Sequence, residues 1–509
     1  MRNFAAALLN SLDKHYSLNN NMDKGSLSSS QRRMPGVAVS AIPIVALIGA
    51  LVTVIVLKGA DSVQDYGYLM LLSAAAICLF AARCSGTLNR QMLMAGLWKS
   101  GRQILPAIPI LVFIGTLSAT WMLSGVVPTL IHYGLDMLDA QVFLPVACMV
   151  CAVVSVVTGT SWTTIATIGV AFMGIGTVMG YSPGWIAGAI ISGAYFGDKV
   201  SPLSDTTVLA SSSTGVDLFR HIRFLTITTA PAMLVALGVY ALVGFTSDGI
   251  GAADSLGMTR ALEECFNITP WILVIPGLTA VMIAMRLRTD LTLALSSLTG
   301  LAGMFIFQPG IVGALGGDGG FVSAVKMSME VLMTSTGITT GNELLDSLVS
   351  TSGVAGMMPT VLLVLGAMFF GGAMLGTGML QSITGWFTGR LRSPLRMVGA
   401  TVGSGLFLNS CTGDQYLSLI VGANMYKAAY RKAGLKPQLL SRSLEDSVSV
   451  TSVLIPWNSC GLTQSTVLGV ATLVYAPFCL FNILSPVLSV LVAWAGWGVH
   501  RKRVVVAAA

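Results

Sequence analysis

Long apolar stretches recur along this chain, and they constrain its fold more than any other feature. They approach or exceed the ~20 residues that cross a bilayer as a helix. They lie near 36–57, 66–82, 104–125, 224–245, 270–285, 291–308, 354–378 and 477–498. Only 10% of the 509 residues are charged, and the mean hydropathy is +0.79. So few charges cannot solvate the surface of a water-soluble protein of this size. The sequence therefore predicts an all-α polytopic membrane protein.

Lys and Arg are unevenly distributed between the loops that join these stretches. Basic residues gather in the segments 83–102, 220–223 and 427–442, whereas the loops 126–141 and 247–269 hold few. Because cytoplasmic loops of membrane proteins carry the excess of Lys and Arg, we expect both termini in the cytoplasm. The net charge of +7 is spread over many short loops, so we expect no nucleic-acid partner.

Landmarks of the first half of the chain recur in the second half at a nearly constant distance. The paired landmarks are Pro106 with Pro359, Gly125 with Gly378, Thr158-Gly159 with Thr412-Gly413, Ser201-Pro202 with Ile455-Pro456, and Pro231 with Pro486. Each pair is separated by 253 to 255 positions. Secondary transporters are often built from two related halves, so this steady distance predicts an internal structural repeat.

The charge pattern orients the two halves oppositely. The span at 104–125 leaves a basic loop and so runs outward, whereas its partner at 354–378 ends before a basic loop and so runs inward. The sides of the membrane assigned to the loops are then consistent only if two segments in each half do not cross it as simple helices. The predicted re-entrant hairpins are 142–177 and 397–425, and the predicted interrupted helices are 183–215 and 445–475.

These features predict an inverted-repeat secondary transporter with two re-entrant hairpins, two interrupted helices and about ten full spans. The predicted organisation is a polar cytoplasmic tail at 1–35, two N-terminal helices at 36–103, the first repeat at 104–245, connecting helices and a loop at 246–353, the second, inverted repeat at 354–498 and a C-terminal cytoplasmic tail at 499–509. The sequence contains no ATP-binding P-loop and no obvious nucleophile–base pair or cofactor motif. We therefore expect neither an enzyme nor a cofactor.

Four segments combine helix-breaking Gly or Pro with side-chain oxygens, at 158–161, 197–207, 409–414 and 455–461. A helix broken inside hydrocarbon survives only where protein or water satisfies its backbone, and the freed groups are natural ligands for an ion. The candidate ion- or substrate-binding residues are Thr158, Thr160, Ser161, Asp198, Ser201, Ser204, Asp205, Thr206, Asn409, Ser410, Thr412, Asp414, Asn458 and Ser459. Na⁺ is a hard cation that prefers such oxygens, and we expect it at Asp205, Ser201 and Thr160.

Carboxylates within these segments are candidates for proton coupling. They cost ~2.5–3.5 kcal/mol each on insertion scales and usually mark function. The candidates are Asp198, Asp205, Asp414 and Asp446. Structural alternatives stay open: the acids of 197–207 could cap a turn, Lys199 could neutralise Asp198, and Glu445 with Asp446 could pair with Arg442.

The motif Gly193–Thr207, which reads GAYFGDKVSPLSDTT, resembles the NhaC family of sodium/proton antiporters, as does the segment 215–223 that follows it. In the second half, 412–416, 444–446 and 455–458 agree with the same family. The resemblance extends from about residue 36 to residue 498. It implies a secondary transporter of the bacterial inner membrane, with the inverted-repeat fold of the ion-transporter superfamily, that exchanges Na⁺ for H⁺ by alternating access.

The resemblance also sets the expected partners. Na⁺, H⁺ and the lipid bilayer come first. Because the family is similar to malate–lactate antiporters and to some sodium-coupled amino-acid carriers, the alternative is a Na⁺- or H⁺-coupled carrier of a small organic anion or amino acid. A homodimer is the assembly we consider.

Overall fold

The computed structural model describes residues 34–59, 62–105, 107–246, 260, 262–285, 287–316, 319–334, 351, 353–388 and 393–497. Nearly all of both predicted tails, together with Pro106, lies outside these residues. Every regular element within them is helical, which confirms the predicted all-α class.

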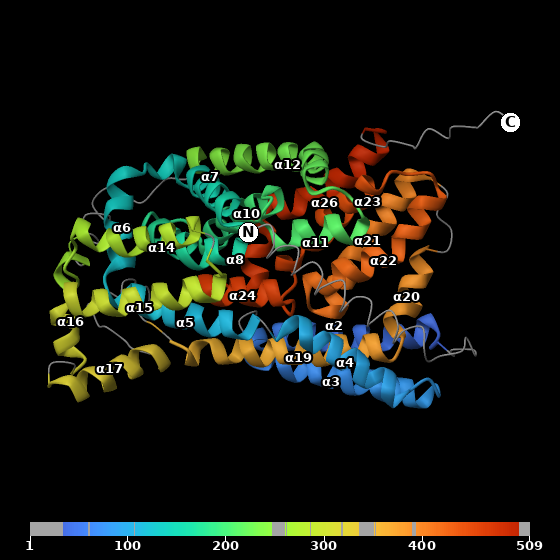
Figure 1. Ribbon diagram of the computed structural model, residues 1–509, viewed down its shortest axis with the longest axis horizontal. Helices are drawn as coiled ribbons and strands as arrows, with labels where there is room; N and C mark the ends of the chain where they lie inside the picture. The colour runs from blue at the N-terminus through green and yellow to red at the C-terminus, as the bar shows by residue number, and fades with distance from the viewer. Residues whose placement is uncertain are drawn as a thin grey trace, which may run out of the picture.

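The helices fall into three groups along the chain (Figure 1). The first group is α2 (Val37–Lys58), α3 (Ser62–Cys84), α4 (Arg90–Ile104), α5 (Ala107–Leu123), α6 (Val126–Met137), α7 (Ala140–Thr158), α8 (Ser161–Thr164), the π-helix η1 (Ile165–Gly169), α9 (Val170–Val178), α10 (Pro183–Val200), α11 (Asp205–Thr214) and α12 (Leu218–Thr246). The second is α14 (Val274–Ala284), α15 (Thr289–Phe307), α16 (Pro309–Ala314) and α17 (Phe321–Met333). The third is α19 (Met358–Gly376), α20 (Met379–Thr388), α21 (Pro394–Thr412), α22 (Gln415–Lys432), α23 (Pro437–Leu444), the π-helix η4 (Glu445–Ser449), α24 (Ser459–Leu468), α25 (Thr472–Tyr475) and α26 (Leu480–Trp494).

Among the described residues, eight helices are long and apolar enough to cross a membrane, or up to nine if the bent pair Thr472–Phe478 and Leu480–Trp494 is one span. These helices confirm a multi-pass membrane protein. The count differs from the predicted ten because α14 is short and neither predicted interrupted helix is both long and apolar enough to count as a span, although α10 has 18 residues. By contrast, Ala140–Thr158 and Ser161–Val178 both qualify.

Helices in the two halves end at matched glycines. Gly in the left-handed region, which other residues adopt only with strain, commonly terminates a helix. The matched glycines, with their φ angles, are Gly125 (80°) and Gly378 (78°), Gly159 (72°) and Gly413 (66°), Gly180 (83°) and Gly434 (68°), and Gly215 (75°) and Gly469 (66°). Each pair is 253 or 254 positions apart, so the spacing of the sequence landmarks recurs in the backbone.

Short and polar helices lie inside the helical assembly. In Figure 1, α12 runs along one edge and α3 along the opposite edge, with α8, α11 and α24 between them. The α7 helix packs against α10 and α12, while α24 packs against α5 and α19. Any Cβ at Gly193 or Gly197 would collide with the α7 backbone. These small residues therefore let α10 approach α7 closely, as helices do in membranes where apolar contact gives no net driving force.

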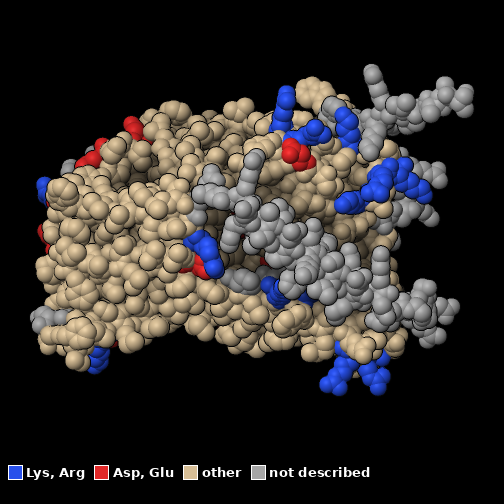
Figure 2. All heavy atoms as spheres, viewed as in Figure 1, with Lys and Arg blue, Asp and Glu red and all other residues tan. Residues whose placement is uncertain are grey.

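Charged side chains gather at the ends of the molecule. On the face shown in Figure 2, Lys and Arg cluster at the end that carries α23 and the ends of α3 and α4. The opposite end, near α6 and α16, carries fewer basic groups, and most of the surface between the ends is uncharged. Large apolar side chains such as Val45, Val52 and Val56 of α2 are exposed, as a lipid-facing surface requires.

Candidate functional site

The first break in the helices separates α7 from α8. Gly159 turns the chain in the left-handed region, and Thr160 is extended before α8 begins at Ser161. The freed N-terminus of α8 points at a carboxylate from another helix: Asp198 of α10 accepts hydrogen bonds from the Ser161 amide (3.1 Å) and from the Ser161 hydroxyl (2.7 Å). A helix N-terminus favours a negative charge in this position.

The same local geometry recurs where α21 gives way to α22. The Thr158 hydroxyl donates to the Thr160 carbonyl (3.2 Å), and the Thr160 amide donates back to that hydroxyl (3.3 Å). At 254 positions further on, the Thr412 hydroxyl donates to the Asp414 carbonyl (2.9 Å), and the Asp414 amide donates back to it (3.2 Å). Asp414 also caps α22, because its Oδ1 accepts from the Leu417 amide at 2.8 Å. Both threonine hydroxyls are thus committed to holding a turn.

The second pair of breaks precedes α11 and α24. Ser204 caps α11, and Asn458 caps α24 by accepting from the Cys460 amide at 3.1 Å. Asn458 also donates to the Asn409 carbonyl (3.2 Å). The Ser201 hydroxyl donates to the Val156 carbonyl (2.8 Å), so it ties the break after α10 to the end of α7.

A cavity of about 280 Å³ lies between these breaks. Its lining residues are Ala107, Ile110, Gly159, Thr160, Trp162, Asp198, Asp205, Thr206, Thr289, Asp414, Gln415, Tyr416 and Ser459. Three carboxylates therefore meet in it, two from the first half of the chain and one from the second. No Lys, Arg or His stands among these described lining residues. The cavity is suited to a positively charged solute.

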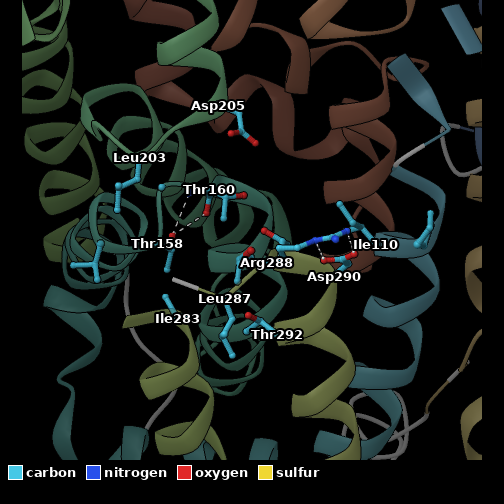
Figure 3. A pocket seen from close by; sticks show the side chains of 15 residues that line it. Ile110, Thr158, Thr160, Leu203, Asp205, Ile283, Leu287, Arg288, Asp290 and Thr292 are labelled. Carbon is cyan, nitrogen blue, oxygen red and sulfur yellow. Dashed lines mark hydrogen bonds and ion pairs between the residues drawn. The ribbon is translucent and has the colours of Figure 1, made fainter. Parts of the chain in front are cut away.

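A larger pocket of about 610 Å³, here called the vestibule, adjoins this cavity and shares Thr160 and Asp205 with it. Figure 3 shows both residues on one side, with Arg288 and Asp290 on another. Arg288 donates two hydrogen bonds to Asp290, at 3.2 and 2.7 Å, so its charge is locally balanced. Asp205 is exposed to the vestibule, whereas Asp414 is only 3% exposed.

The structure brings together some of the predicted site residues and separates others. Lining the cavity are Thr160, Asp198, Asp205, Thr206, Asp414 and Ser459. Outside its lining are Thr158, Ser161, Ser201, Ser204, Asn409, Ser410, Thr412, Asn458 and Asp446. Of the expected Na⁺ ligands, Thr160 and Asp205 share the cavity, but the hydroxyl of Ser201 is occupied by backbone contacts.

Sequence reasoning missed several cavity residues. Trp162, Gln415 and Tyr416 each follow a helix break by a few positions, so the breaks themselves could have pointed to them. Tyr416 lines the same cavity as Asp198, Asp205 and Asp414. Thr289 comes from α15 and has no signal in the sequence.

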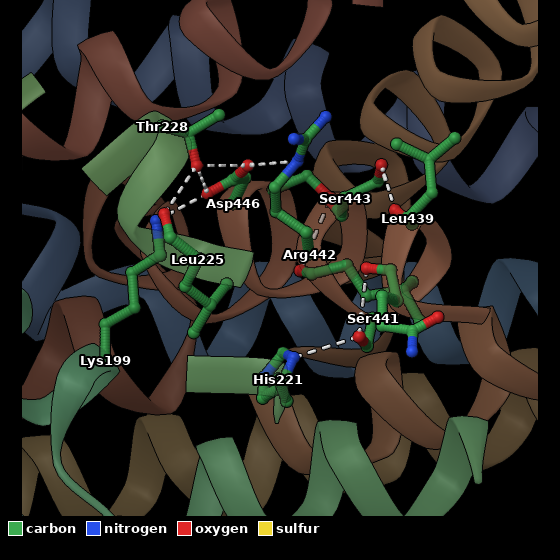
Figure 4. A network of polar contacts seen from close by, with 12 residues as sticks. Lys199, His221, Leu225, Thr228, Leu439, Ser441, Arg442, Ser443 and Asp446 are labelled. Atoms are coloured by element: carbon green, nitrogen blue, oxygen red, sulfur yellow. Dashed lines mark hydrogen bonds and ion pairs between the residues drawn. The ribbon is translucent and has the colours of Figure 1, made fainter. Parts of the chain in front are cut away.

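A second polar cluster, outside the lining of the cavity, lies on α10, α12, α23 and η4 (Figure 4). Lys199 Nζ lies 2.5 Å from Asp446 Oδ1, and the side chains are 1% and 0% exposed. The Thr228 hydroxyl lies 3.0 Å from both oxygens of Asp446, and Arg442 Nε lies 3.9 Å from Oδ2. Of the open alternatives, Lys199 pairs with Asp446 and not with Asp198, and Asp446 does approach Arg442.

The glycine turn at the first break can be tested by substitution. Replacing Gly159 by Ala should lower the free energy of unfolding by about 1–2 kcal/mol for the left-handed backbone alone. The loss should be larger because the new Cβ would lie 2.6 Å from the Cβ of Leu203. Gly434→Ala is the control, because Gly434 has φ +68° but no atom within 4 Å of its added Cβ. Equal losses in both variants would contradict a tight turn at Gly159.

Comparison with known proteins identifies the family. The profile of the "Na+/H+ antiporter family" matches residues 27–213 and 193–497. The Na⁺/H⁺ antiporter NhaC of Alkalihalophilus pseudofirmus is 35% identical over 77% of this chain and 83% of its own length. A malate-2H⁺/Na⁺-lactate antiporter of Bacillus subtilis is 32% identical over 77% of this chain and 81% of its own length. The arginine/ornithine antiporter ArcD of Halobacterium salinarum is 33% identical over 92% of this chain and 94% of its own length. The resemblance inferred from residues 193–207 is confirmed, and the chain belongs to the Na⁺/H⁺ antiporter family.

Proposed function

We propose that this protein exchanges Na⁺ for H⁺ across the bacterial inner membrane by alternating access. The observation that carries the proposal is the cavity in which Asp198, Asp205 and Asp414 meet between two sets of helix breaks. Its relatives' names include Na⁺/H⁺ antiporters, and the donor set of carboxylate and hydroxyl oxygens is the kind that a hard cation prefers.

Competition for the same carboxylates provides the coupling. A carboxylate enclosed by protein needs a compensating positive charge, which either a cation or a proton supplies. A bound proton removes the charge that attracts Na⁺, so the two bind alternately without a covalent step. A difference of one pH unit supplies about 1.4 kcal/mol per proton, and 100 mV supplies ~2.3 kcal/mol per net charge moved. Either one sustains a roughly tenfold or larger Na⁺ gradient.

The alternating movement is proposed to rest on an inverted repeat, formed by 104–245 and 354–498, that follows two N-terminal helices in 36–103. The matched glycine turns and the matched threonine contacts support two halves of one plan. With 246–353 as a connecting segment, one re-entrant hairpin and one interrupted helix in each half give about ten full spans. The basic end seen in Figure 2 supports cytoplasmic termini. A homodimer stays a prediction.

Within this site the residues have different proposed roles. Thr160, Asp198, Asp205, Thr206, Asp414 and Ser459 are proposed to contact the ion. The remaining predicted residues are proposed to hold the breaks in shape. Asp446 lies outside the cavity in contact with Lys199, so its proposed part in proton coupling would act through that pair.

The second candidate is a coupled carrier of an organic solute, which the names of the malate–lactate and arginine/ornithine antiporters suggest. An organic anion would have to enter a cavity lined by three carboxylates, and the vestibule's Arg288 is already paired with Asp290. Charge therefore favours a cation over an anion. A cationic amino acid is the form of this alternative that fits the cavity best.

Flux in proteoliposomes tests both candidates. With purified protein, an imposed Na⁺ gradient should drive proton movement in the absence of any organic solute, and reversing the gradient should reverse the movement. Malate, lactate, arginine and ornithine are then added one at a time. Proton movement that appears only with one of them, or that needs no Na⁺, would contradict the proposal.

A further inference from the structure

A cavity of about 540 Å³ between α6, α7, α9 and α14 takes no part in the proposed exchange. Its wall is almost entirely apolar, with Leu130, Val150, Phe172 and Pro276 among its residues. No Asp, Glu, Lys, Arg or His stands among the described residues that line it. The hydroxyls of Thr158, Thr167 and Thr279, which also line it, already donate to backbone carbonyls. Trp121 contributes a buried Nε1 without a hydrogen-bond partner, and this single donor is too little to hold ordered water throughout the cavity.

Water is a poor occupant of this space. An ordered buried water needs two to four polar partners, and apolar cavities of comparable character stay dry. An empty volume of this size is also costly, because the side chains around it lose their contacts. The cavity therefore calls for an apolar occupant.

The surrounding bilayer supplies one. The rim includes Met137, Val153 and Val157, which are 82%, 59% and 53% exposed, and α7 is long and apolar enough to cross a membrane. In a membrane-spanning helix, such exposed apolar side chains face lipid. The cavity is thus continuous with the lipid-facing surface.

The volume matches one hydrocarbon chain. At about 30 Å³ for each water-sized group, 540 Å³ holds roughly eighteen such groups, and a methylene is similar in size to a water molecule. We propose that one acyl chain of a bilayer lipid occupies this cavity. Because the chain exchanges one apolar environment for another, the hydrophobic effect adds little affinity, and the high local concentration of lipid fills the site.

The occupied cavity would bear on the transport path. It shares Val157, Thr158 and Ile283 with the vestibule, and Figure 3 shows Thr158 and Ile283 on the vestibule side. The acyl chain lies behind that wall, where it fills the space next to the turn at Gly159 and keeps water from reaching the vestibule from the side.

Photocrosslinking with a lipid tests the assignment. The protein is placed in nanodiscs of phosphatidylcholine that carries a diazirine near the end of one acyl chain, and the crosslinks are mapped by mass spectrometry. Crosslinks are expected on Ala171, Phe172 and Ile175 of α9, which line the cavity but are at most 7% exposed. Ala280→Trp at the rim should lower them about tenfold or more.

The matched control is Ala284→Trp. Ala284 is exposed one turn further along α14 but does not line the cavity, so this variant should retain the crosslinks on α9. The proposal is wrong if wild-type crosslinks are confined to outward-facing residues such as Leu278, or if Ala280→Trp leaves the α9 crosslinks unchanged. Crosslinking does not depend on transport, so this test can fail or succeed independently of the proposed exchange of Na⁺ and H⁺.

Discussion

Replacing Asp198 by Asn should reduce Na⁺-driven proton movement in proteoliposomes at least about 100-fold. The carboxylate lines the cavity and accepts two hydrogen bonds from Ser161. Asparagine keeps the shape but can bind neither a proton nor a cation by charge. Loss of a charge-assisted contact costs about 1.5–3 kcal/mol, which is roughly one to two factors of ten in binding, and the loss of the exchangeable proton adds to it.

The control variant is Asp136→Asn. Asp136 has a side chain that is 67% exposed and lies outside the cavity, so exchange should stay near the wild-type rate. Asp205→Asn should behave like Asp198→Asn, because both acids line the same cavity. Correctly inserted Asp198→Asn protein that exchanges at a near-normal rate would remove this residue from the site.

The second large effect is expected on stability. Asp446→Asn should lower the free energy of unfolding by about 3–5 kcal/mol, because it leaves Lys199 and Arg442 buried without an anionic partner. Unfolding of the purified protein in nanodiscs, followed by heat or denaturant, measures the loss. The double variant Asp446→Asn with Lys199→Met should recover a large part of it, since a buried charge is then removed together with its partner.

An exposed ion pair provides the comparison. The side chains of Arg288 and Asp290 are 83% and 34% exposed, and such pairs contribute about 0–1 kcal/mol. Asp290→Asn should therefore change stability little. A similar loss from Asp290→Asn and Asp446→Asn, or a double variant no more stable than Asp446→Asn, would show that burial of the Lys199–Asp446 pair is not the cause.

The positions of helices and of their breaks can be predicted from the sequence because, in lipid, few structures satisfy the hydrogen bonds of the backbone. An apolar run near twenty residues has to be helical, and Gly159 and Gly413 end helices at sites where a left-handed residue is needed. The same reasoning predicts Asp198, Asp205 and Asp414 as site residues, and all three line one cavity in the structure. The length of an apolar run sets only the greatest length that its helix can have, however. The run 270–285 forms an α-helix, α14, only from Val274 to Ala284.

The direction in which each side chain points cannot be predicted from the sequence in the same way. Lys199 follows Asp198 directly, but successive residues on a helix point about 100° apart, so Asp198 reaches the cavity while Lys199 reaches Asp446, 247 positions away. Hydroxyl groups present the same difficulty. Ser201 has the right chemistry for Na⁺ and yet donates to a backbone carbonyl, as Ser and Thr often do in broken helices. Composition does not distinguish the two uses.

The paired glycine turns have a consequence for how such a chain can diversify. They place residues 254 positions apart in matching surroundings, yet the chemistry at those places differs: Thr160 stands opposite Asp414, and Asp205 opposite Ser459. In both pairs, the position that corresponds to an acid in the other half of the chain carries a hydroxyl and not a second acid. In the proposed repeat, the polar side chain at a break in one half can therefore differ from its counterpart in the other half, while the glycine turns keep the backbone of both breaks alike.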